Sequence, residues 1–178
     1  MRMTERHISR EGIIAALSFV LTVAFAPISF SLVQFRISES LMLIAAITPS
    51  AIPGLFVGCI IANLYGGYGF IDIAFGSIAT LLAAMMTWYI ARKAAPVANK
   101  FKVAIFPLPS IIINGIIVGG YLPFIIPEIR ELSESFFIVL GISAGSVILG
   151  QTVVTYLLGI PLYFAVKRTN VFKSDEFL

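Results

Sequence analysis

Long apolar runs constrain the fold of this sequence more than any other feature. A helix needs about 20 apolar residues to cross a hydrocarbon core of ~30 Å, and five runs approach or exceed that length. They occupy residues 12–32, 41–64, 71–91, 103–126 and 136–166. Only 12% of the 178 residues are charged, whereas soluble domains average about 25%. The sequence therefore predicts a single integral-membrane, all-α domain over residues 1–178.

The second apolar run is interrupted by Pro49 and Pro53, which lie four residues apart. Each proline removes an amide donor and disfavours a continuous helix. The run at 41–64 is therefore either one kinked span or a tight hairpin of two short helices with its turn at 48–53.

The positions of the basic residues favour the hairpin. With six spans, ten of the twelve Lys and Arg residues lie at the two termini and in the loop at 92–102, on one side of the membrane. Only Arg36 and Arg130 lie on the other side. Five spans would place four basic residues inside and eight outside, which reverses the positive-inside bias. We therefore expect a six-transmembrane-helix bundle with both termini cytoplasmic, in which the short helices need not each cross fully.

Several classes of function lack their motifs in this sequence. There is no phosphate-binding loop ending in Lys-Ser or Lys-Thr, no HExxH and no convincing inverted repeat. The lone Cys59 and the single His7 argue against disulfide, metal and proton-relay sites inside the bundle. We expect no enzyme activity, cofactor or metal, and we attribute the net charge of +3 to topology rather than to nucleic-acid binding.

Polar residues gather toward the predicted outer ends of the spans. Charge at membrane depth costs roughly 2.5–3.5 kcal/mol per residue on insertion scales, so such a cluster predicts a ligand cavity that opens outward. Two alternatives remain: Arg36 can lie in a solvated interfacial turn, and polar residues prefer helix ends in any case. The outer group comprises Gln34, Arg36, Glu39, Asn63, Tyr65, Asp72, Tyr121 and Glu128, with Asn114 and Gln151 deeper.

Pairs of small residues recur at four-residue spacing, which lets helices approach closely in lipid. For Gly54/Gly58, Gly115/Gly119 and Gly141/Gly145 we expect this packing role. The pair Gly12/Ala16, in the predicted cytoplasmic half of the first helix, can instead present a flat strip to a partner protein.

Three segments carry a resemblance to a known family. They read QFRISE at 34–39, IPGLFVGCIIANL at 52–64 and DIAFGSIATLLAA at 72–84. In this order they resemble the QueT family of queuosine-precursor transporters, whose members look like substrate-binding S components of energy-coupling factor (ECF) importers. The resemblance covers most of the chain.

The resemblance implies a six-helix bundle in the bacterial plasma membrane that captures a 7-deazaguanine from outside. It also implies a membrane coupling protein and two cytoplasmic ATPases as partners, with docking through Gly12, Ala15 and Ala16, and a bundle that topples in the membrane to deliver its ligand. The free base, the 7-aminomethyl and the 7-cyano forms all remain open as ligands. Alternative functions are an autonomous facilitator, an ion-coupled carrier, or an S component for another vitamin-like heterocycle.

A neutral deazaguanine offers a ring N–H and an exocyclic amine side by side, and one carboxylate can accept both. We expect Glu39 to read this edge, with Asp72 and Asn63 nearby, unless Glu39 only forms a salt bridge with Arg36. Phe35, Tyr65 or Tyr121 can stack on the ring, and Arg36 or Asn63 can donate to its carbonyl oxygen. The candidate binding residues are Gln34, Phe35, Arg36, Glu39, Asn63, Tyr65, Asp72, Asn114 and Tyr121.

Overall fold

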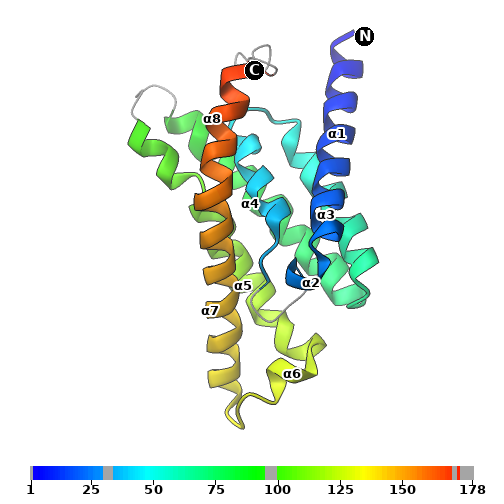
Figure 1. Ribbon diagram of the computed structural model, residues 1–178, viewed down its shortest axis with the longest axis vertical. Coiled ribbons are helices and arrows are strands. Elements are labelled where there is room, and N and C mark those ends of the chain that lie inside the picture. The colour runs from blue at the N-terminus through cyan, green and yellow to red at the C-terminus, as the bar shows by residue number, and fades with distance from the viewer. Residues whose placement is uncertain (1, 30–33, 95–99, 170–171, 173–178) are drawn as a thin grey trace.

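The computed structural model describes residues 2–29, 34–94, 100–169 and 172, and every regular element among them is helical. The long helices form an elongated bundle (Figure 1). They are α1 (Arg2–Ala24), α3 (Ala51–Gly66), α4 (Ser77–Ala94), α5 (Leu108–Ile125), α7 (Phe136–Val154) and α8 (Ile160–Thr169). The remaining elements are α2 (Ala26–Ser29), α6 (Pro127–Arg130), the 3₁₀ helices η1 (Ile37–Ala46) and η3 (Lys100–Ile105), and the π-helical turns η2 (Asp72–Gly76) and η4 (Thr155–Gly159).

Four of the described segments are long and apolar enough to cross a membrane. They are His7–Ala24, Asp72–Ala94, Lys102–Ile125 and Phe136–Thr169. The prediction of an all-α membrane protein is therefore confirmed. The count of six spans and the side on which the termini lie stay predictions, because η1 and α3 are shorter apolar helices.

The second apolar run is a hairpin rather than one kinked span. Ser38, at the start of η1, accepts a hydrogen bond from Thr22 near the end of α1 (2.8 Å). Ser50, just before α3, lies 2.7 Å from the ring of His7 near the other end of α1. The chain therefore reverses between η1 and α3. At about 2.0 Å per residue, the ten residues of η1 reach roughly 20 Å, which is less than the ~30 Å core of a bilayer.

Glycines bring two helix pairs into close contact, as predicted. A Cβ atom at Gly58 would lie 2.8 Å from the main-chain oxygen of Ala15, and one at Gly54 would lie 2.8 Å from that of Glu11. Between α5 and α7, a Cβ atom at Gly119 would lie 2.5 Å from the Cα of Ala144. Such contacts are possible only for residues without a side chain, so these glycines set the distances between the helices.

The prediction for Gly141/Gly145 is wrong. Both glycines are exposed, and a Cβ atom at either would have no neighbour within 4 Å. The reason is helical phase: Ser143 and Val147 are buried, and a residue two positions away points about 200° around the helix. These two glycines therefore face outward from α7.

The helix η1 occupies the centre of the bundle. Met42 and Leu43 are fully buried, and every residue from Ser38 to Ala45 is buried. Runs of 3₁₀ helix longer than three or four residues are uncommon, so the packing around η1 stabilises this one. Gly159 in η4 permits the approach, because a Cβ atom there would lie 3.1 Å from Leu43 and 3.3 Å from the main-chain oxygen of Ser40.

Candidate ligand-binding site

The interior of the bundle contains charge. Among the described residues, the buried charged side chains are Arg36, Glu39 and Asp72, each 6% exposed or less. They come from the segment before η1, from η1 itself and from η2. The interpretation of Arg36 as part of a solvated interfacial turn is therefore wrong. Buried charges in membrane proteins usually mark a functional site.

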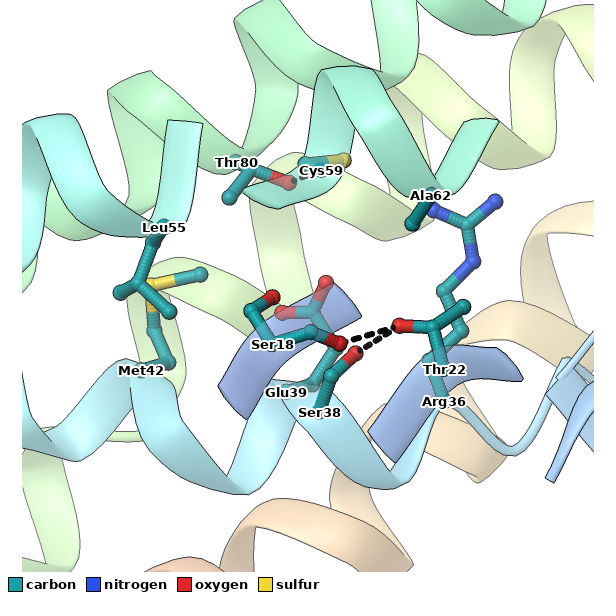
Figure 2. A pocket seen from close by; sticks show the side chains of 10 residues that line it. All are labelled: Ser18, Thr22, Arg36, Ser38, Glu39, Met42, Leu55, Cys59, Ala62 and Thr80. Atoms are coloured by element: carbon teal, nitrogen blue, oxygen red, sulfur yellow. Dashed lines mark hydrogen bonds between the residues drawn. The ribbon is translucent and has the colours of Figure 1, made fainter. Parts of the chain in front are cut away.

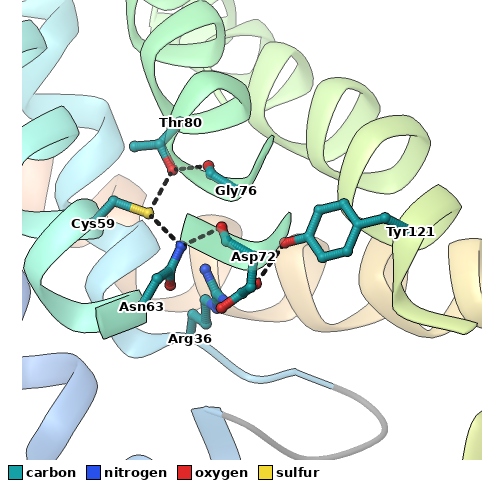
Figure 3. A network of polar contacts seen from close by, with 7 residues as sticks. All are labelled: Arg36, Cys59, Asn63, Asp72, Gly76, Thr80 and Tyr121. Carbon is teal, nitrogen blue, oxygen red and sulfur yellow. Dashed lines mark hydrogen bonds and ion pairs between the residues drawn. The ribbon is translucent and has the colours of Figure 1, made fainter. Parts of the chain in front are cut away.

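Asp72 is at the centre of one polar network (Figure 3). Its Oδ1 atom accepts a hydrogen bond from the hydroxyl of Tyr121 (2.6 Å) and lies 3.5 Å from Nη2 of Arg36. The side-chain amide of Asn63 donates to the main-chain oxygen of Asp72 (2.9 Å). Residues far apart in the sequence thus converge on one carboxylate.

The π-helical turn η2 makes this network possible. A Cβ atom at Gly76 would lie 2.7 Å from the side-chain amide nitrogen of Asn63 and 2.9 Å from the hydroxyl of Tyr121. Without a side chain at this position, both polar groups can reach Asp72. Single π turns in helices occur frequently at functional sites.

Glu39 is at the centre of a second network, in which its partners are neutral side chains. Its Oε2 atom accepts hydrogen bonds from Ser110 (3.3 Å) and Asn114 (3.4 Å). The hydroxyl of Ser110 is also 2.9 Å from Oε1 of Gln151, and its single hydrogen can serve only one acceptor well. Glu39 therefore does more than pair with Arg36 at an interface: it is buried and takes part in a network that joins η1, α5 and α7.

A small cavity lies beside both networks (Figure 2). Its volume of about 10 Å³ is room for roughly one water molecule. A purine-sized ring is much larger, so the cavity is closed to such a ligand in this conformation. The residues that line it are Ser18, Thr22, Arg36, Ser38, Glu39, Met42, Leu55, Cys59, Ala62 and Thr80.

Several of these lining residues were not predicted from the sequence. Thr80 donates a hydrogen bond to Gly76 and lies 3.3 Å from the sulfur of Cys59, and Thr22 donates to Ser38. Ser and Thr side chains often bond to their own helix backbone, so isolated examples carry little signal. The available signal was spacing. The two members of each pair are four positions apart and therefore lie on one helix face; the pairs are Ser18/Thr22, Cys59/Asn63 and Ser110/Asn114.

Three further predicted residues belong to neither network. Tyr65 is 60% exposed at the end of α3 and packs edge-on against Phe19, with 6.3 Å between ring centroids. Phe35 is half-buried, and its main-chain amide donates to Ile28. Gln34 is buried and has a φ of 35°, a value that few residues other than glycine adopt. Tyr65 is therefore removed from the site.

Two of the three residues predicted for docking lie on the exposed face of α1. Gly12 and Ala16 are exposed on the outer face, together with Val20. Ala15 is 9% exposed and lies against Gly58 of α3, so it belongs to the packing of α1 on α3 and not to an outward-facing strip.

The family model described as "QueT transporter" matches residues 8–168, which is most of the chain. No curated protein matches the sequence, and no solved structure matches the fold.

Proposed function

This chain belongs to the QueT transporter family, and we propose that it is the S component of an ECF-type importer that captures a queuosine precursor. Family membership makes it a multi-pass transport protein of the bacterial plasma membrane and not an enzyme. The observation that supports a binding role is the burial of Arg36, Glu39 and Asp72 together in a bundle whose other described buried side chains are uncharged.

The ligand in this proposal is a 7-deazaguanine held between the two networks. Glu39 accepts the ring N–H and the exocyclic amine, while Arg36 or Asn63 donates to the carbonyl oxygen. Tyr121 or Phe35 is the stacking partner. The small cavity means that the ring enters only after Glu39, Arg36 and the helices around them move apart.

The proposed topology has six spans and both termini in the cytoplasm. In support, α1 begins and α8 ends at the same end of the bundle (Figure 1). Basic side chains near the ends of helices lie over aromatic rings, as for Arg92 on Trp88 (5.2 Å) and Lys167 on Tyr163 (5.7 Å). Aromatic residues concentrate at both membrane interfaces, so these pairs are suited to a membrane boundary. The exposed strip at Gly12 and Ala16 then faces a membrane coupling protein, to which two ATPases are attached.

The test of ligand identity is mass spectrometry of small molecules released from the purified full-length protein. We expect a 7-deazaguanine, and its affinity can then be measured by titration calorimetry. Recovery of a different vitamin-like heterocycle, with no binding of any deazaguanine, would refute the assignment of the substrate.

A further inference from the structure

The buried charges do not balance. The described interior holds two carboxylates, Glu39 and Asp72, and one guanidinium, Arg36. In their usual ionised forms these groups leave an excess of one negative charge. An uncompensated charge in the interior of a membrane protein is costly, and a neutral deazaguanine would not remove that cost.

The two carboxylates differ in how they are compensated. Asp72 lies 3.5 Å from Arg36 and accepts a hydrogen bond from Tyr121. Glu39 instead accepts hydrogen bonds from the neutral groups of Ser110 and Asn114. Arg36 attracts both carboxylates, but its ion pair is with Asp72, so the excess negative charge is centred on Glu39, which also lines the cavity.

The site also holds acceptor atoms that lack donors. Oδ1 of Asn63 and Oδ2 of Asp72 are buried and accept no hydrogen bond from the residues that the structure describes. Buried acceptors without donors are unfavourable, so a ligand rich in N–H groups fits this interior. An ammonium group supplies three donors and no acceptor.

We infer that the ligand is a cation: a deazaguanine with a protonated amine on its side arm, such as the 7-aminomethyl form, in preference to the free base or the 7-cyano form. This inference rests on the proposed function and adds the charge of the substrate to it. The ammonium need not touch Glu39, because Coulomb attraction in a bundle interior acts over several ångströms. Glu39 can therefore hold the ring edge and still select the cation.

The test uses ligands of nearly equal size and different charge. Titration calorimetry on the purified full-length protein compares 7-aminomethyl-7-deazaguanine with its neutral 7-hydroxymethyl analogue and with the 7-cyano compound. We expect the cation to bind about 10-fold more tightly or better, a factor that corresponds to about 1.4 kcal/mol of attraction to the buried charge. Equal affinities would overturn this inference and leave the proposed function intact, whereas no binding of any of the three would refute the proposed function itself.

Two variants test whether the charge of Glu39 causes the preference for the cationic ligand. Glu39→Gln keeps the shape of the side chain and leaves Arg36 and Asp72 as a balanced pair of buried charges. The preference for the cation should therefore fall to roughly 3-fold or less. Ser110→Ala removes a hydrogen bond to Glu39 but no charge, and it should retain the wild-type ratio even where both affinities fall. A ratio that survives in Glu39→Gln would overturn the role given to this charge. Should Glu39→Gln fail to fold, the comparison of ligands on the wild-type protein still decides the inference.

Discussion

At the scale of single residues, the sequence singled out the charged groups that the structure buries but not their partners. Segment 34–39 and Asp72 stood out because charge is rare in such apolar surroundings. The ion pair of Arg36 with Asp72 joins residues 36 positions apart, and the contact of Glu39 with Asn114 joins residues 75 positions apart. Contacts at such separations follow from helix packing, and one sequence does not reveal which helices are neighbours.

Replacement of Glu39 by Gln should weaken binding of a deazaguanine by roughly 10-fold to 150-fold. A hydrogen bond to a charged group contributes about 1.5–3 kcal/mol, and each 1.4 kcal/mol is a factor of ten. Titration calorimetry on the folded protein measures the change. Asp72→Asn is the paired variant: a large loss there with no change in Glu39→Gln would make Asp72 the recognition carboxylate, and no loss in either would disprove the site.

At the scale of helices, the sequence predicted the existence of the elements better than their type. The break at Pro49 and Pro53 left a kinked span and a hairpin open, the positions of the basic residues favoured the hairpin, and the structure has it. The 3₁₀ form of η1 and the π turns η2 and η4 were not predicted, because these forms depend on neighbours. In each case a glycine, Gly76 or Gly159, allows a close contact that a side chain would block.

The glycine contact between α1 and α3 gives a prediction about stability. Gly58→Leu should destabilise the protein by about 1–3 kcal/mol, because overpacking a tight contact forces the backbone to shift. Gly145→Leu is the matched control on α7, where nothing lies within 4 Å of an added Cβ, and its effect should stay within about 0.5 kcal/mol. Unfolding of both variants in detergent measures the difference. Equal destabilisation would mean that the contact at Gly58 does not limit the packing of α1 on α3.

The exposed face of α1 gives a prediction about coupling. Ala16→Trp should abolish uptake in cells that contain the partner proteins, while ligand affinity stays nearly unchanged, because Ala16 faces away from the bundle. Ala15→Trp is the contrasting variant. Its side chain is buried against α3, so the variant should lower folding stability. Loss of ligand affinity in Ala16→Trp equal to the loss of uptake would place Ala16 in the packing of the bundle instead.

At the scale of the whole molecule, topology is the property to test. With Cys59 removed, single cysteines at Val97 and Glu131 report which side each loop faces. An impermeant thiol reagent added to intact cells should label the cysteine at 131 and spare the one at 97, since six spans place these loops on opposite sides. Labelling at 97 from outside, or none at 131, would exclude the six-span arrangement.

The proposed role as a binding subunit, together with the closed cavity, predicts that this chain does not complete transport alone. A binding subunit must open to take in its ligand and must then be driven to release the ligand on the other side of the membrane. This sequence has no phosphate-binding loop of the kind that supports ATP hydrolysis. Vesicles that contain only this protein should therefore bind a radiolabelled deazaguanine and show negligible uptake. The addition of the coupling protein, the two ATPases and ATP should produce uptake that a non-hydrolysable ATP analogue does not support. Substantial uptake by the chain alone would favour a facilitator, and uptake that follows an imposed proton gradient would assign Glu39 and Asp72 to ion coupling instead.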